Sequence, residues 1–162
     1  MAIPFRRSQA GPSDLRCAYI ELLERDSKIF GGLLVTDPKG LPKEFVYNQI
    51  AVPAGVLWPT GEVRKSAASS LSHSLFDACE QNPSLLLGGF ALQESGFAPA
   101  AFAVSLPFAL VDDGQLAWVG LEPAPSHPAT ILSSELKAQK LLEEPFSRIA
   151  KALLEVYGLS EV

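Results

Sequence analysis

Three side chains within one stretch of this chain have the types and spacing that proton transfer requires. His73, Asp77 and Glu80 are separated by four and then three residues, so a helix would place them on one face. On such a face a carboxylate can orient an imidazole ring for general-base catalysis. Nearby serines would supply a nucleophile: Ser66, Ser69, Ser70, Ser72 and Ser74. One hypothesis is therefore a small enzyme that uses His73 with Asp77 or Glu80.

The same three residues are also typical of a solvated helix surface. No sequence feature fixes a serine in the strained elbow from which a hydrolase exposes its nucleophile. We therefore favour a surface face over a catalytic site and a non-enzyme over an enzyme. The enzyme hypothesis requires His73 to line a concave pocket.

The sequence offers little for a metal ion or a cofactor. Its two histidines, His73 and His127, form no ligand pair at the spacing of a zinc or iron motif. Gly31-Gly32 and Gly88-Gly89 are not followed by the Lys-Ser/Thr pair or the helix start of a phosphate-binding loop. We predict no metal and no cofactor.

Three other residues are candidates for contact with a second molecule or element. Gly31 and Gly32 interrupt an apolar strand, where glycine permits a bulge or the close approach of another backbone. Trp58 lies in the proline- and glycine-rich loop 49–61, and its large ring needs a partner surface. We interpret Trp58 first as a lid on the core and second as a binding residue.

Composition describes an ordinary globular protein that is mildly acidic. The 162 residues are 48% hydrophobic and 19% charged, with a net charge of -5. This charge argues against the broad basic face that phosphate backbones require, so we predict that nucleic acid is not bound directly. An accessory factor in nucleic-acid processing or phage defence remains an alternative. It would need four cations to converge on one face: Arg6, Arg7, Lys28 and Lys43.

Nothing in the sequence indicates export or membrane insertion. Cys17 and Cys79 lie among apolar neighbours and are expected to stay reduced, and the first residues lack the apolar core of a secretory signal. The uncharged run 97–111 has 15 residues and two prolines, whereas a spanning helix needs about 20 apolar residues. We predict a cytoplasmic protein without a membrane contact.

The firmest structural prediction is a hairpin from Ile29 to Tyr47. An apolar, β-rich run is followed by Asp37-Pro38-Lys39-Gly40, in which each residue suits its position in a type I turn. The preceding segment, 15–23, matches both helical and strand spacing. We favour a strand, because the polar break 25–28 would let it open a meander.

The remaining segments complete an α+β fold. We expect residues 1–13 to be a flexible lead-in and 14–162 to form one domain. The sheet is predicted to be mostly antiparallel, with five or six strands, a long central helix and C-terminal helices packed on it. The expected elements after the hairpin are a helix over 60–81, a strand over 84–92, a hairpin of 101–111 with 115–121, and helices over 133–157 with a break at Pro145.

The stretch Lys28–Tyr47, KIFGGLLVTDPKGLPKEFVY, resembles the opening hairpin of roadblock/LC7 and longin-like domains. Its GGLLV-x-D-x-x-G-x-P-x-EF pattern also resembles small uncharacterised bacterial proteins. If 15–23 were helical, the order of elements would be that of a roadblock domain. Such domains are non-catalytic dimerising platforms for GTPases and motors, so the resemblance implies assembly rather than turnover.

These observations lead to one functional prediction. High apolar content, many prolines and the lack of a convincing catalytic or metal set favour a non-catalytic protein-interaction or accessory subunit of a bacterial-type cytosolic assembly. Its partner would be another protein or a second copy of the chain.

Overall fold

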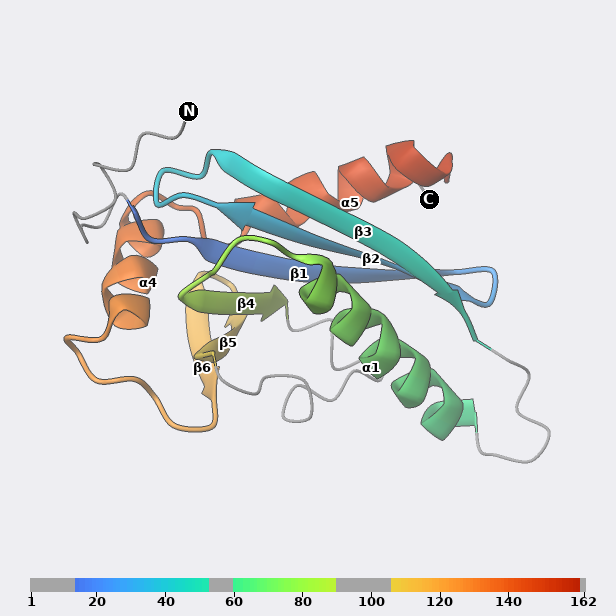
Figure 1. Ribbon diagram of the computed structural model, residues 1–162, viewed down its shortest axis with the longest axis horizontal. Helices are drawn as coiled ribbons and strands as arrows, with labels where there is room; N and C mark the ends of the chain where they lie inside the picture. Colours follow the sequence, from blue (N-terminus) through green and yellow to red (C-terminus); the bar gives the residue numbers. More distant parts are fainter. Residues whose placement is uncertain (1–13, 53–59, 90–105, 161–162) are drawn as a thin grey trace.

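The computed structural model describes residues 14–52, 60–89 and 106–160. The expected lead-in 1–13 and the candidate Trp58 lie outside these residues. In the described residues three helices surround one sheet, as Figure 1 shows. In chain order the elements are β1 (Cys17–Arg25), β2 (Lys28–Thr36), β3 (Pro42–Ala51), α1 (Thr60–Ala78), β4 (Leu85–Gly89), β5 (Phe108–Asp112), β6 (Gln115–Val119), α4 (Pro128–Ala138) and α5 (Glu144–Tyr157).

The six strands form a single mixed sheet in the order β3-β2-β1-β4-β5-β6. The pairs β1–β2, β2–β3 and β5–β6 are antiparallel, whereas β1–β4 and β4–β5 are parallel. The predicted α+β fold with a mostly antiparallel sheet is therefore confirmed.

Most of the segment 15–23, whose spacing in the sequence matches both a strand and a helix, belongs to strand β1, next to the centre of the sheet. Its side chains alternate between two apolar cores: Ala18 belongs to one, Tyr19 to the other and Ile20 again to the first. A strand buries both sets at once, which a helix in this position would not. The roadblock order of elements requires a helix here, and that condition is not met.

The β2–β3 turn forms as its residues predict. The Asp37 carboxylate accepts hydrogen bonds from the backbone N–H groups of Lys39 and Leu41, at 2.8 and 3.0 Å. Gly40 has a φ of 84°, a left-handed conformation that glycine adopts without strain. The turn fixes the register in which β3 pairs with β2.

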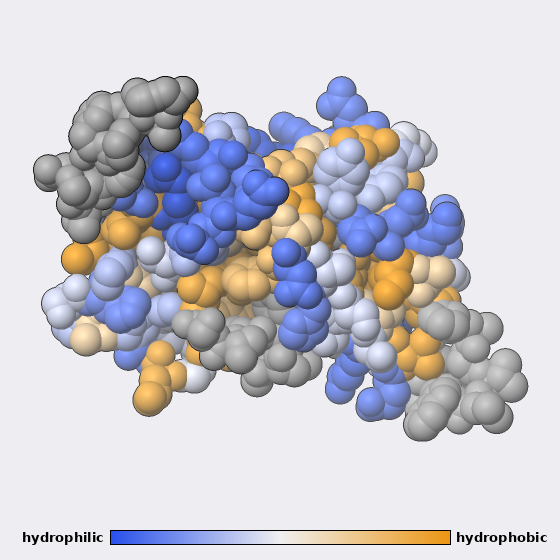
Figure 2. Space-filling view, viewed as in Figure 1, coloured by the Kyte–Doolittle hydropathy of each residue, from blue (hydrophilic) through white to orange (hydrophobic). Residues whose placement is uncertain are grey.

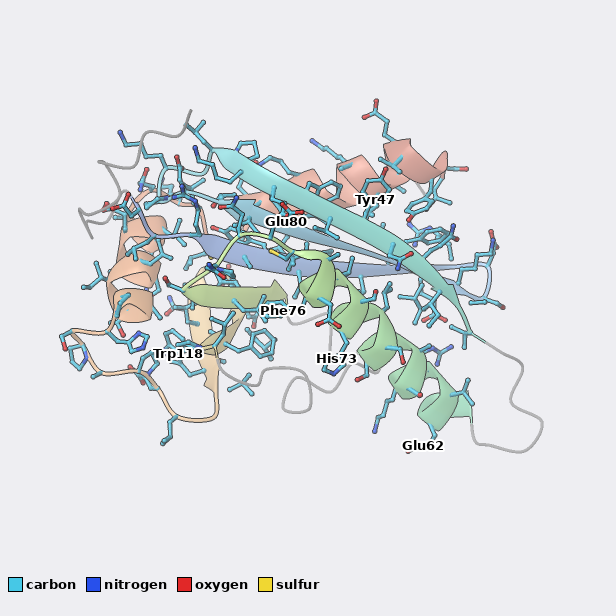
Figure 3. The ribbon with its side chains drawn as sticks, viewed as in Figure 1. Tyr47, Glu62, His73, Phe76, Glu80 and Trp118 are labelled. Atoms are coloured by element: carbon cyan, nitrogen blue, oxygen red, sulfur yellow. The ribbon has the colours of Figure 1, made fainter. Side chains whose placement is uncertain are left out.

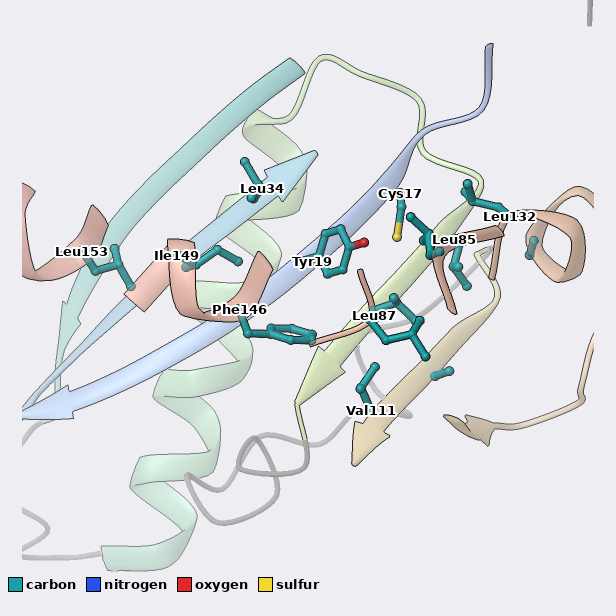
Figure 4. Close-up of a cluster of buried hydrophobic side chains, with 14 of the residues drawn as sticks. Cys17, Tyr19, Leu34, Leu85, Leu87, Val111, Leu132, Phe146, Ile149 and Leu153 are labelled. Carbon is teal, nitrogen blue, oxygen red and sulfur yellow. The ribbon is translucent and has the colours of Figure 1, made fainter. Parts of the chain in front are cut away.

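Helices cover both faces of the sheet. In Figure 1, α1 lies in front of the sheet and α5 behind it. Figure 4 shows the cluster behind the sheet, where Tyr19 packs edge-on against Phe146 of α5 and donates a hydrogen bond to the Leu141 carbonyl. The protein therefore has three layers, with one core on either side of the sheet.

The first of the C-terminal helices begins earlier than the sequence indicated. Helix α4 starts at Pro128 because the His127 ring nitrogen Nδ1 accepts a hydrogen bond from the Ala129 N–H, at 3.0 Å. Histidine is not among the side chains usually expected to cap a helix, so the signal was not recognised. The predicted break at Pro145 is confirmed, since α5 starts at Glu144 with a proline in its first turn.

Within the three described ranges, no helix is both long and apolar enough to span a membrane.

Candidate functional site

The predicted His73, Asp77 and Glu80 set is only partly brought together. His73 and Asp77 lie on the exposed side of α1, but the helix ends at Ala78, before Glu80. Figure 3 shows His73 directed away from the sheet, whereas Glu80 lies beyond the helix end beside β3. The helical face that would join the three residues therefore stops short of the third.

Glu80 instead contributes its backbone to a contact made by Glu44 of β3. The Glu44 carboxylate accepts the N–H groups of Glu80 and Gln81, at 3.0 and 2.9 Å, and the Cys79 thiol at 3.4 Å. Desolvation opposes ionisation, but these three donors together outweigh it and hold the pKa of Glu44 below its ordinary value. This carboxylate ties the edge strand to the segment after α1.

The Cys79 thiol is a poor nucleophile in this setting. Burial, reinforced by the hydrogen bond to Glu44, raises the pKa of Cys79 to about 11. The reactive form of cysteine is the thiolate, and little of it exists at neutral pH when the pKa is this high.

The candidate binding glycines lie beneath the helices. A Cβ atom on Gly31 would come within 2.9 Å of Leu22 and Leu75 side-chain atoms, and one on Gly32 within 2.7 Å of Ile149 Cγ2. These glycines therefore allow α1 and α5 to pack closely on the two faces of β2. The atoms that approach these glycines belong to packed side chains of this chain, and a role of Gly31 and Gly32 in binding a second molecule stays a prediction.

A residue that the sequence analysis did not single out occupies a more unusual place. Glu21 lies on β1, opposite Gly32 of β2, on the face of the sheet that carries α5. The parallel pairing of β1 with β4 ends at Ile20 and Gly88, so Glu21 lies beside Gly89, the last residue of β4. Its Oε1 atom is 3.9 Å from the position that a Cβ on Gly89 would take.

The environment of Glu21 disfavours its charge. Its Oε1 atom is buried and has no hydrogen-bond partner among the described residues. Burial raises the pKa of Glu21 to about 7, although the Leu22 N–H acts in the opposite direction. The side chain therefore exchanges a proton near neutral pH, as a general acid or base must.

The topology gives this position a further meaning. After β1 the chain turns to β2 on one side, while β4 is followed by β5 on the other, so the connections leave these parallel neighbours in opposite directions. In open sheets, ligands bind where connections diverge outside the carboxyl ends of parallel strands. Gly89 is the last residue of β4, and Glu21, in the middle of β1, lies beside it. We call these two residues the Glu21 site.

Sequence reasoning missed Glu21 for an identifiable reason. Its orientation depends on whether 15–23 is a strand, which was left open. Once Tyr19 and Leu23 are known to point toward the α5 core, Glu21 is a carboxylate between two apolar residues on an inward face. A charged residue at an inward strand position was the available signal.

The cations named for nucleic-acid contact do not form one patch. Lys28 is opposite Ala51 at one end of the β2–β3 hairpin, and Lys43 lies near the turn at the other, roughly 25 Å away along the strand. Figure 2 shows hydrophilic residues gathered around the β2–β3 turn. Arg6 and Arg7 lie outside the described residues.

The described part of the chain contains no group of three His, Cys, Asp or Glu side chains placed to hold a metal ion.

Comparison with known proteins places this mixed sheet with its flanking helices in a recognised fold. No family model matches the sequence, and neither does any curated protein. The structure is similar to that of endonuclease V from Streptomyces avermitilis, with a TM-score of 0.57 and 13% identity over 91% of this chain and 83% of that one. It is also similar to endonuclease V from Bacillus subtilis, with a TM-score of 0.50 and 12% identity over 89% of this chain and 80% of that one.

These neighbours correct two predictions. The main functional prediction, a non-catalytic protein-interaction subunit, is wrong, because the proteins that share the fold are endonucleases rather than interaction platforms. The prediction that nucleic acid is not bound directly is wrong on the same finding. It rested on the net charge of -5, which is a sum over the whole chain and does not exclude cations at one site.

Proposed function

We propose that this protein is a factor in nucleic-acid processing and that its substrate contacts the Glu21 site. The observation that carries the proposal is the likeness of about nine-tenths of the chain to two endonuclease V structures. The position and protonation of Glu21 then indicate where on the fold the substrate would lie.

The chemistry of Glu21 suits a phosphate-containing substrate. Its protonated form can donate a hydrogen bond to a phosphate oxygen, and its ionised form can accept a proton from an attacking water. A pKa of about 7 keeps both forms populated at neutral pH. The ionised form repels a phosphodiester, so binding is strongest when Glu21 is protonated.

The test is direct binding of nucleic acid by the full chain. Labelled single-stranded and duplex DNA are titrated with protein, and fluorescence anisotropy is followed as salt is raised from about 50 to about 200 mM. We expect binding that weakens with salt, because phosphate contacts release counterions. No binding of either DNA up to about 100 μM protein at low salt, the weak limit of non-specific association, would contradict the proposal.

A matched pair of variants locates the contact. Glu21→Gln replaces the ionisable carboxyl by a neutral group of the same shape, while Glu122→Gln makes the same change on an exposed residue of the β6–α4 loop. Only the first is expected to alter DNA affinity, strengthening it above about pH 7, where wild-type Glu21 is charged. Equal behaviour of the two variants would move the contact away from the Glu21 site.

A further inference from the structure

Among the described residues, only two buried side-chain polar atoms lack a hydrogen-bond partner, and they lie on the same strand. One is Glu21 Oε1 and the other is Arg25 Nε. The residues are four apart on β1, so their side chains leave the same face of the sheet. At about 3.3 Å per residue, their Cα atoms are about 13 Å apart.

The Arg25 guanidinium makes its one hydrogen bond within the described structure to the residue next to it in the sequence. Its Nη1 donates to the carbonyl oxygen of Glu24, at 3.0 Å. The Glu24 carboxylate is engaged by Arg64, at 3.0 Å, and no ion pair to Arg25 exists within the described ranges. Arg25 is therefore a partly buried cation without a carboxylate partner in the described structure.

A partly buried guanidinium without a carboxylate partner costs free energy unless a bound anion accepts its hydrogen bonds. Taking part of a guanidinium out of water without a paired acceptor loses hydration that the protein does not replace. Arginine is also the side chain whose planar fork best matches phosphate oxygens. The exposed Lys28, which pairs with Arg25 across the β1–β2 turn, adds a second positive charge, while the exposed Asp26 in that turn opposes it.

We propose that Arg25 binds a backbone phosphate of the nucleic acid that occupies the Glu21 site. This inference rests on the proposed function and assigns a direction to the substrate, along β1 from Glu21 toward the β1–β2 turn. Beyond Gly89 the edge of β1 on this side is no longer paired with β4. At a rise of about 3.4 Å per nucleotide, the 13 Å separation corresponds to about four nucleotide steps.

The test compares two charge-removing variants of the full chain, Arg25→Gln and Lys137→Gln. Lys137 lies in the last turn of α4, and Gln139, just after this helix, donates a hydrogen bond to the Pro38 carbonyl of the β2–β3 turn. This turn is at the opposite end of β2 from the β1–β2 turn that follows Arg25. DNA affinity is measured by anisotropy from about 50 to about 200 mM salt. We expect Arg25→Gln to weaken binding about three- to tenfold and to reduce the salt slope by about 0.9 for duplex or about 0.7 for single strands.

Lys137→Gln is expected to leave affinity and slope unchanged. Arg25→Lys keeps the charge but loses the fork, so the slope should match wild type while affinity falls several-fold. It also keeps the test decisive if Arg25→Gln fails to fold. Wild-type affinity and slope in Arg25→Gln, or wild-type affinity in Arg25→Lys, would overturn the inference. Absence of DNA binding by the wild type would instead refute the proposed function.

Discussion

Two glutamates, one near the centre of the sheet and one at its edge, show how position determines what a carboxylate can do. Glu44 on β3 accepts two backbone N–H groups and a thiol, and these donors favour its charge. Glu21 on β1 has a buried oxygen with no partner in the described structure, and burial disfavours its charge. The first is a structural tie, whereas the second destabilises the fold when ionised and is the stronger candidate for chemistry.

The largest expected effect comes from neutralising Glu21. Its pKa is raised in the folded state from 4.5 to about 7, so its contribution to stability is fully present below about pH 4.5 and is lost as pH rises through about 7. At about 1.4 kcal/mol per pKa unit, Glu21→Gln should raise the free energy of unfolding near pH 8 by up to about 3 kcal/mol. Urea denaturation near pH 8 and pH 5 measures this.

The gain should shrink to less than about 1 kcal/mol near pH 5, where wild-type Glu21 is mostly protonated when folded. Glu122→Gln serves as the control at both pH values. A Glu21→Gln variant less stable than wild type near pH 8 would show that the ionised carboxylate is satisfied after all.

A second effect concerns Gly32, the residue of β2 that lies directly opposite Glu21. Gly32→Ala would place a Cβ atom 2.7 Å from Ile149 Cγ2, and the branched side chain cannot easily move away from it. We expect a loss of about 1–3 kcal/mol, measured by thermal or urea unfolding, because α5 must shift outward. An unchanged stability would mean that α5 is not held closely against β2.

Neutralising Glu44 should have a smaller effect than neutralising Glu21, and of the opposite sign. It should lower the free energy of unfolding rather than raise it. Glu44→Gln leaves one oxygen acceptor for three donors, and its partial exposure limits the loss in unfolding free energy to about 1 kcal/mol near pH 7.

The lowered pKa of Glu44 contributes stability above its unfolded pKa, and this is lost as pH falls through the folded value. The difference between wild type and Glu44→Gln should therefore shrink in acid, which denaturation near pH 3 checks. A constant difference across pH would argue against a role for the charge.

The smallest change adds one methyl group beside Glu21. A Cβ on Gly89 would lie 3.9 Å from Glu21 Oε1, which is ordinary contact, so Gly89→Ala should change stability by less than about 1 kcal/mol. It should nevertheless exclude water and raise the pKa of Glu21 slightly further. The measurement is the midpoint of the pH dependence of stability. A downward shift of this midpoint would contradict the contact between residue 89 and the Glu21 carboxyl.

Local features of the fold were predictable and long-range ones were not. The β2–β3 turn follows from Asp37, Pro38 and Gly40, whose preferences act within four residues. The register of Ile20 with Gly88, by contrast, joins positions 68 residues apart, and no local pattern specifies it. The Glu21 site depends on that register, so it became visible only in the folded chain.

The candidate site was missed because its residues form no recognisable pattern in the sequence. His73, Asp77 and Glu80 attract notice because they are close in sequence, yet α1 ends before Glu80. Glu21 and Arg25 carry the unpartnered polar atoms, but each is a single charged residue in a strand. Burial without a partner is a property of the packed structure, and the sequence contains it only implicitly.

The pH dependence of DNA binding by wild type and Glu21→Gln tests the central claim most directly. If the Glu21 site contacts the nucleic-acid backbone, wild-type affinity falls as pH rises through about 7, while the affinity of Glu21→Gln stays level over the same range. A wild-type affinity that does not change through about pH 7, or a variant that shows the same fall, would contradict it.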